Sequence, residues 1–517
     1  MSAAYTIATA EGAFSSAQEQ FDAMAKHLAS VVALDMTHDA IERYVVNEGR
    51  ELERRMLQAH LDLRAAAERI VAVVGKDGVE RRDRRRSTRV LMSLVGEVGV
   101  SRLLYQGDGV VGLAPLDASL NLPREAYSLG VRRRVSEEVA SASFDHAVER
   151  ISETTGAVIA KRQVEQVTRR AAFDFDGFYA ARPLDVEDEA GMLLVLTFDA
   201  AGIIVRTEDL RDATRRAAEK QGRDPDWPPK RLGTGQKRNR KRMAQVAAVY
   251  AIEPYMREPE DIVRELRRVQ DATPRKPRPK PANKRAWASV KRDAGDVIDV
   301  AFQEALRRDP ERRRRWVVLV DGSKAQLDLV RAAAAKVGAE IEIVLDLLHM
   351  LEYLWKAAHC FHPHGTVEAE RWVTERLVML LDGADASAVA GGIRRSATLQ
   401  GLEQRGGVDA CAAYLCKYRA LIRYAEAIEQ GWPIATGVIE GACRYLVRDR
   451  MDKTGARWSV EGAEAVLQLR ALRANGDFDE YWAYHVRAEH DRNHASRYDG
   501  KNVPNPLPTR GHLRRVK

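Results

Sequence analysis

Three acidic residues stand at positions that could form one catalytic site. Asp199 and Asp321 each follow a short apolar run, at residues 193–198 and 316–320, and Glu440 lies near the start of a late helix. Continuous apolar runs predict buried parallel strands, and ligands bind at the carboxyl ends of such strands. Carboxylates that converge there can hold two Mg²⁺ or Mn²⁺ ions roughly 3.5–4 Å apart. The sequence therefore predicts two-metal phosphodiester chemistry, with Asp199, Asp321 and Glu440 as the catalytic metal ligands.

Asp346 and His349 are predicted to support these ligands. Asp346 ends the next apolar run, residues 341–345, and would lie one strand farther from Asp199, a step of about 4.8 Å. An orienting role is therefore expected for it rather than direct metal binding. His349 falls on the first turn of the following helix, where it could lie near a phosphate or could serve only the local structure.

The order of the predicted elements indicates how these residues are positioned. Three antiparallel strands, a crossover, and then alternating strand and helix form the order of an α/β ribonuclease-H-like catalytic core. In that fold the first and fourth strands are neighbours, so Asp199 and Asp321 would stand about 5 Å apart. The expected strands are residues 193–198, 203–206 (after a turn at 200–202), 243–252, 316–320 and 341–345, and the expected helices are 259–269, 284–308 and 324–337.

The N-terminal region is expected to be mainly α-helical and to bind DNA. Residues 15–74 and 128–175 have helical periodicity, and residues 89–105 suit a small β-hairpin. A glycine-bearing turn near residue 156 joins two helices in the manner of a helix-turn-helix. A helical hairpin with solvated cations is the alternative. The second helix would present Lys161, Arg162, Arg169 and Arg170 to DNA.

The distribution of charge also indicates a polyanionic partner. The chain has 83 Lys and Arg against 75 Asp and Glu, for a formal net charge of +8. Residues 230–242 contain seven basic residues and no acid, and residues 275–285 contain six and no acid. Each basic run could be only a solvated loop, but several such runs together favour contact with phosphates. Trp458 could stack on a base or fill the core. The expected contacts there are Lys237, Arg238, Arg240, Lys241, Arg242, Arg444, Arg448, Lys453, Arg457 and Trp458.

The composition indicates in which cellular compartment the protein is expected. Four cysteines without zinc-ligand spacing, and no secretion signal at Met1, predict a protein of a reducing cytoplasm, at the bacterial nucleoid. The apolar runs are of strand length, so no membrane association is expected.

Several motifs resemble those of one family. VDGSK at 320–324, LDLLHMLEYLW at 345–355, ATGVIEG at 435–441 and TGARWSVEGAEAVLQLRAL at 454–472 look like a DDE transposase of a bacterial insertion sequence, ISKra-type group. The resemblance extends over about residues 90–490. It implies that Asp199, Asp321 and Glu440 form the metal-binding triad and that an all-helical insertion precedes Glu440.

The resemblance implies an enzyme that binds terminal inverted repeats and transfers strands into double-stranded target DNA, as a homodimer or larger assembly. A structure-selective ribonuclease-H-like DNA nuclease and a domesticated, non-catalytic DNA-binding protein are the alternatives. The expected organisation is an N-terminal helical region (1–88), a small β insert with a helix-turn-helix-like region (89–185), the core (190–350), a helical insertion (351–430), the Glu440 part of the core (431–490) and a basic tail (491–517).

Overall fold

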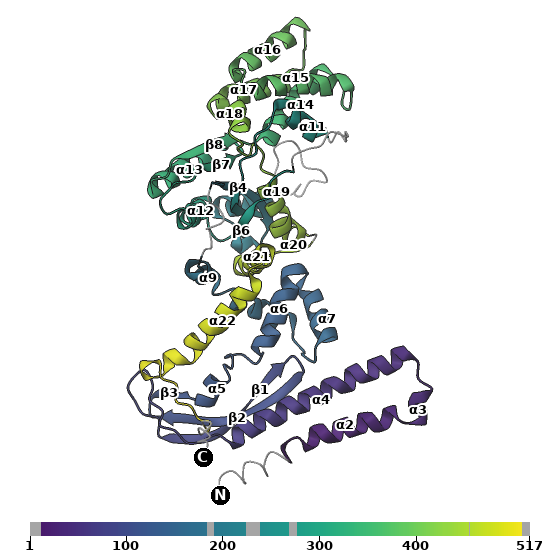
Figure 1. Ribbon diagram of the computed structural model, residues 1–517, viewed down its shortest axis with the longest axis vertical. Helices are drawn as coiled ribbons and strands as arrows, with labels where there is room; N and C mark the ends of the chain where they lie inside the picture. Colours follow the sequence, from purple (N-terminus) through teal and green to yellow (C-terminus); the bar gives the residue numbers. More distant parts are fainter. Residues whose placement is uncertain (1–11, 184–190, 224–237, 268–276, 454, 509–517) are drawn as a thin grey trace, which may run out of the picture. The chain divides into compact units, whose positions relative to one another are not determined.

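The chain folds into two compact units (Figure 1). The computed structural model describes residues 12–183, 191–223, 238–267, 277–453 and 455–508. The first unit comprises Met1–Ala181 together with Asp477–Lys517, and the second comprises Arg182–Gly476. The end of the chain therefore completes the unit that its beginning starts. None of the described helices has the length and apolarity needed to cross a bilayer.

A five-stranded mixed sheet forms the core of the second unit. Its order is β6-β5-β4-β7-β8, with β4, β5 and β6 antiparallel and with β7 and β8 parallel to β4. Every residue of β7 is buried, which explains why its sequence is apolar without alternation. The predicted mixed α/β class is confirmed. The strands are β4 (Leu193–Ile204), β5 (Lys241–Ile252), β6 (Ala282–Ser289), β7 (Trp316–Val320) and β8 (Ile341–Leu345).

Helices cover both faces of this sheet. On one side α12 packs on β4 and β5 and against α13, and on the other side α19 packs on β4 and β5 while α21 packs on β6 (Figure 1). The helices around the sheet are α10 (Asp212–Gly222), α11 (Pro259–Arg267), α12 (Ala294–Arg308), α13 (Lys324–Val337), α19 (Gly437–Ala442), a π-helical turn (Cys443–Arg448), α20 (Asp449–Met451) and α21 (Val460–Asn475).

The region between β8 and α19 is helical. Its helices α14 and α17 pack together, and α15 and α16 pack beside them. The bounds are α14 (Leu347–Phe361), α15 (Val367–Leu381), α16 (Ala386–Leu399), α17 (Gly406–Tyr418) and α18 (Tyr424–Glu429).

The expected turn at residues 200–202 is wrong. The chain continues through these residues as one strand, β4, so the separate strand expected at 203–206 does not form. Ala200, Ala201 and Gly202 pair in unbroken register with Gln245, Ala244 and Met243 of β5. Small residues marked a turn in the sequence, but a long antiparallel partner satisfies their backbone groups as a strand.

The expected helix at residues 284–308 is wrong in its first part. Residues 282–289 form β6, and α12 begins only at Ala294 after a capping box at Asp293. Because this segment begins with polar residues, its sequence did not indicate a strand. Arg285 is buried in β6 because its Nη1 lies 2.6 Å from Glu304 Oε2 of α12. β6 therefore supplies the third antiparallel strand of the sheet.

The first unit combines helices with a three-stranded sheet of order β1-β2-β3. The predicted hairpin is present with a third strand added, and the N-terminal helices end at Ala66 rather than near residue 74. The elements are α2 (Ser15–Leu28), α3 (Val31–Leu34), α4 (His38–Ala66), β1 (Asp83–Ser93), β2 (Gly96–Gly107), β3 (Val110–Leu113), α5 (Pro115–Ser119), α6 (Leu129–Ser141), α7 (Phe144–Thr154), α8 (Lys161–Ala171), α9 (Phe175–Ala181) and α22 (Phe478–Asn493).

Gly156, in the turn between α7 and α8, touches the β1–β2 hairpin. Its N–H donates to Leu94 O at 2.7 Å, and a Cβ at this position would lie 2.5 Å from the backbone carbon of Val95. Only glycine permits this approach without a shift of the backbone. The turn that resembled a helix-turn-helix is thus fixed to the sheet of the same unit.

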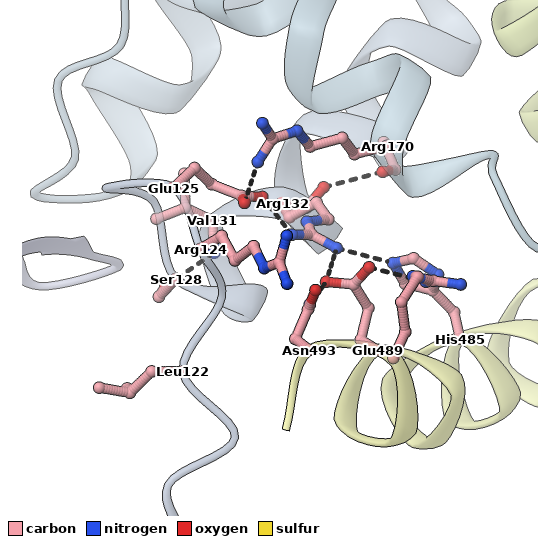
Figure 2. A network of polar contacts seen from close by, with 12 residues as sticks. Leu122, Arg124, Glu125, Ser128, Val131, Arg132, Arg170, His485, Glu489 and Asn493 are labelled. Carbon is pink, nitrogen blue, oxygen red and sulfur yellow. Dashed lines mark hydrogen bonds and ion pairs between the residues drawn. The ribbon is translucent and has the colours of Figure 1, made fainter. Parts of the chain in front are cut away.

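A buried polar network joins α6 to α22 in the first unit (Figure 2). Arg132 of α6 is fully buried and pairs with Glu125 and with Glu489, the latter at 2.9 Å. Its Nη1 also lies 3.0 Å from His485 Nε2. Because arginine can only donate, Nε2 accepts and the proton of His485 lies on Nδ1.

The other ring nitrogen of His485 donates a hydrogen bond to the carboxylate of Asp174. His485 Nδ1 lies 2.7 Å from Asp174 Oδ2, and Arg492 donates two hydrogen bonds to the same carboxylate at 2.8 and 2.9 Å. Burial alone would raise the pKa of Asp174, but the hydrogen bonds from His485 and Arg492 outweigh it and lower this pKa to about 2. The ionised carboxylate is therefore preferred in the folded chain.

This pKa predicts an acid-dependent contribution to stability. Because the folded-state pKa of Asp174 lies below its ordinary value of 3.8, the contribution is present above about pH 4 and is lost as the pH falls toward 2. Asp174→Asn should lower the free energy of unfolding at pH 7 by about 2 kcal/mol, and the difference from wild type should narrow by pH 3. Calorimetric unfolding at both pH values measures this.

Asp491→Asn is the matched control. Asp491 lies on the same helix, α22, and forms an exposed pair with Lys501 at 2.9 Å. Exposed pairs contribute little, so this variant should unfold like wild type at both pH values. An equal loss in the two variants would contradict the role of the buried network.

Candidate active site

Parallel pairing brings three aspartates to one edge of the five-stranded sheet. β4 pairs with β7 and β7 pairs with β8, so the predicted adjacency of the first and fourth strands is correct. Asp321 directly follows β7 and Asp346 directly follows β8. Asp199 lies two residues beyond Thr197, the last residue of β4 that pairs with β7. The three carboxylates therefore gather where parallel strands end.

Asp346 joins this edge to the segment that carries Glu440. Its carboxylate is 4% exposed and accepts hydrogen bonds from the backbone N–H groups of Leu348, at 3.3 Å, and His349, at 3.2 Å. It also accepts one from Thr436 N at 3.1 Å, just before α19. Asp346 thus caps α14 and positions the start of α19.

Asp321 is exposed and faces the helical region. Its Oδ1 accepts from Ser323 N at 2.8 Å, and its backbone oxygen accepts from the Tyr414 hydroxyl at 3.3 Å. Gly322 has φ +92°, and a Cβ there would lie 3.1 Å from the Tyr418 ring. The turn after β7 is therefore held against tyrosines of α17.

Tyr353, Tyr414 and His349 surround a hollow beside Asp321. The rings of Tyr353 and Tyr414 stack with centroids 4.0 Å apart, and His349 packs against both. The hollow has a volume of about 460 Å³. His349 therefore lies beside Asp321, and its side chain is 36% exposed.

Asp199 has a neighbour that the sequence analysis missed. Cys443 Sγ lies 3.2 Å from Asp199 Oδ2, while Asp199 Oδ1 accepts from Ala200 N at 2.6 Å. Burial, followed by the charge of Asp199, raises the pKa of the Cys443 thiol, so the thiol stays protonated and donates. The signal was the position of Cys443 three residues after Glu440, on the same face of a helix.

The helix that carries Glu440 changes geometry at Cys443. Residues 443–448 form a π-helical turn between α19 and α20, and such turns occur frequently at functional sites. The turn follows Glu440 by three residues and places Cys443 against Asp199.

Glu440 lies in the field of two other carboxylates. Burial raises the pKa of Glu440, and the charges of Asp346 and Asp199 raise it further. A hydrogen bond from Thr436 and the charge of Arg448 oppose this shift. Glu440, Asp199 and Asp346 therefore repel one another when all three are ionised, a cost that a bound cation would offset.

The donor set suits a hard divalent cation. In the part of the chain that the structure describes, no three His, Cys, Asp or Glu side chains are grouped closely enough to hold a metal ion by themselves. Mg²⁺ is commonly held by one or two carboxylates, with waters and substrate phosphates as the other ligands. Asp199 and Glu440 could hold it in this way, and Asp321 could join them through the exposed turn after β7.

Exposed cations follow Glu440. Arg444, Arg448, Lys453 and Arg457 are exposed on and after the π-helical turn. Trp458 is different, since it is 6% exposed and its Nε1 donates to Met451 O at 3.1 Å, which supports the core alternative.

The basic segment before β5 is only partly described. Arg238 and Arg240 are exposed, whereas Lys237 lies outside the described residues. Lys241 pairs with Asp452 at 3.1 Å, and Arg242 donates to the backbone oxygens of Val290, Asp209 and Lys291. Arg242 therefore has a structural role in this sheet.

In the first unit, α8 presents two kinds of cation. Lys161 pairs with Asp145 at 2.7 Å and Arg170 pairs with Glu125. Arg162 and Arg169 are exposed. The Lys161–Asp145 pair is exposed and weak enough for a phosphate to replace, whereas Arg170 pairs with a largely buried carboxylate that also holds Arg132.

Comparison with known proteins does not assign a family. No protein-family model matches the sequence, and no curated protein matches it. The functional argument therefore depends on the site itself.

The raised pKa of Glu440 predicts how the site responds to pH and to metal. Because the folded-state pKa of Glu440 lies above its ordinary value of 4.5, Glu440 does not lower the free energy of unfolding below about pH 4.5. As the pH rises from there through the folded-state pKa, ionisation of Glu440 lowers the free energy of unfolding. In EDTA, Glu440→Gln should therefore melt about 1–2 °C higher than wild type at pH 7.5, and the two should converge near pH 4.

Millimolar Mg²⁺ or Mn²⁺ should raise the melting temperature of wild type more than that of Glu440→Gln. Glu403→Gln, an exposed control in the same unit, should behave like wild type in both respects. A wild-type melting temperature that does not respond to either ion would count against metal binding by these carboxylates.

Proposed function

We propose that this chain is a Mg²⁺-dependent DNA transposase of the DDE type, which cleaves the ends of its element and joins them to target DNA. The observation that carries the proposal is the position of four acidic residues: Asp321 and Asp346 follow the parallel strands β7 and β8, Asp199 lies in β4 just beyond its pairing with β7, and the charges of Asp346 and Asp199 act on Glu440. Carboxylates in such numbers are costly to place together unless a cation offsets their charge.

The order of the sheet supports the proposal. Three antiparallel strands followed by two parallel strands, in the order β6-β5-β4-β7-β8, is the arrangement expected of a ribonuclease-H-like core. The helices α14–α18 lie between the last strand and the Glu440 helix, where the family resemblance places an insertion.

Each residue of the site has its own role in the proposed reaction. Asp199 of β4 and Glu440 of α19 would hold Mg²⁺, and Asp321 would complete the set. When bound, the metal ions activate the attacking hydroxyl and stabilise the leaving oxygen of the phosphodiester. Asp346 positions Glu440 through Thr436, and the Cys443 thiol holds Asp199 by hydrogen bonding to one of its oxygens.

The cations supply the contacts to DNA. Arg444 and Arg448 are exposed within the π-helical turn that follows Glu440, so they can bind the phosphates that flank the scissile bond. Arg162 and Arg169 are exposed on α8, which we assign to recognition of the terminal inverted repeats. Two DNA ends must meet for joining, so the active species would be at least a dimer.

The test is an excision and joining assay on a marker flanked by the terminal repeats that border the gene. Asp199→Asn, Asp321→Asn and Glu440→Gln should each lose at least about 100-fold in cleavage and joining while still binding the repeats. Asp346→Asn, which loses a positioning group, should retain more activity, with a loss of roughly 10–100-fold.

Asp328→Asn is the matched control, since Asp328 is exposed on α13 and contributes to no part of the site. It should remain fully active. Cleavage without joining by wild type would favour a structure-selective nuclease, and repeat binding without cleavage would favour a non-catalytic DNA-binding protein. Full activity of Asp321→Asn with complete loss in Asp346→Asn would reverse the roles of the two aspartates.

A further inference from the structure

The first unit contains a second polar hollow, far in sequence from the acidic residues of the site. It has a volume of about 570 Å³ and lies between the three-stranded sheet, the loop after α5 and the chain that follows α22. Five cations line it, against two carboxylates. The cations are Lys76, Arg81, Arg89, Arg124 and Arg497.

Both carboxylates of the hollow are already engaged. Asp77 receives two hydrogen bonds from Arg81, each 2.6 Å long. Asp117 lies 3.0 Å from Arg102 Nε, a cation outside the lining. The remaining lining cations form no ion pair in the part of the chain that the structure describes, although the charge of Asp117 acts on Arg89 and Arg497 from a distance.

Two of these cations are fixed by backbone oxygens. Arg89 Nη2 donates to Glu125 O at 2.7 Å, and Arg497 Nη2 donates to Gly112 O at 3.0 Å. Burial lowers the pKa of both guanidinium groups, and the charge of Arg124 lowers that of Arg497 further. Neutral oxygens hold them in place without neutralising their charge.

The other two cations, Lys76 and Arg124, are exposed and unpaired among the described residues. Arg124 extends toward α22 (Figure 2) and lines the hollow with Asn493. Two cations held by backbone oxygens and two exposed, unpaired cations around one hollow form a site with unused positive charge.

We propose that this hollow binds a phosphate group, with Arg89 and Arg497 as fixed donors and Lys76 and Arg124 closing on it. Guanidinium groups match the planar, multidentate acceptors of phosphate. A phosphodiester of double-stranded DNA and a free phosphorylated ligand share this chemistry. The site lies in the unit that carries α8 and requires neither metal nor strand cleavage, so it is independent of the proposed catalytic function.

The test compares full-length wild type with the double variant Lys76→Gln/Arg124→Gln, in EDTA. One arm measures the affinity for a labelled 20-base-pair duplex of arbitrary sequence over a series of salt concentrations. The other arm measures binding of pyrophosphate by calorimetry. The double variant should bind duplex about ten-fold more weakly, and the slope of log affinity against log salt should fall by about 2.

Two controls separate this effect from a general loss of charge or of fold. Lys26→Gln/Arg395→Gln removes the same charge at exposed positions outside the hollow and should stay within about two-fold of wild type. Arg124→Lys keeps the charge and should recover most of the duplex affinity. The double variant should melt like wild type, because neither side chain has a partner in the described structure.

The outcomes distinguish the two sources of phosphate. Loss in the duplex arm identifies a nucleic-acid backbone, and loss of pyrophosphate binding with duplex affinity intact identifies a free phosphorylated ligand. A double variant that matches the Lys26→Gln/Arg395→Gln control in both arms would overturn the proposal. Failure of cleavage in the excision assay would leave all of these results unchanged.

Discussion

The parallel pairing of β4 with β7, and of β7 with β8, is the constraint on which the acidic site depends. It brings Asp199, Asp321 and Asp346 to one edge of the sheet, where each accepts a hydrogen bond from a donor nearby. Backbone N–H groups hold Asp346 and Asp321, and a buried thiol holds Asp199. Glu440 accepts a hydrogen bond from Thr436, yet burial and then the charges of Asp346 and Asp199 raise its pKa.

In the first unit, too, a charged side chain depends on polar partners supplied by the protein. Arg132 has no exposed surface, so a charge that water would otherwise solvate must be met by protein atoms. Glu125, His485 and Glu489 meet it, and Asp174 in turn fixes the tautomer of His485. The network connects α6 with α22, two helices more than 300 residues apart in the chain. Charge satisfaction thus decides which distant segments assemble into one unit.

The sequence allowed those elements to be predicted whose burial is uniform. Residues 316–320 are continuously apolar because both faces of this strand are covered, residues 343–345 likewise end β8 as a buried apolar run, and the helix at 324–337 begins and ends where its pattern does. Prediction failed where a residue's partner is distant. Arg285 belongs to a basic run at the start of an expected helix, but Glu304 of α12 pairs with it as part of β6. Small residues at 200–202 predicted a turn, but β5 pairs with them as a strand.

The sequence alone determined the mixed α/β class and the positions of Asp321 and Asp346 after β7 and β8, because an Asp that ends a short buried strand must emerge at a sheet edge. Asp199 differs from that prediction, since β4 continues through it to Ile204 and only the pairing with β7 ends before it. Only the tertiary structure decided how the carboxylates share their environment. The contact of Cys443 with Asp199, the hydrogen bond from Thr436 to Asp346 and the hydrogen bond from Tyr414 to Asp321 join segments 90 or more residues apart. Such contacts depend on the register of strands and the packing of helices, which local periodicity does not encode.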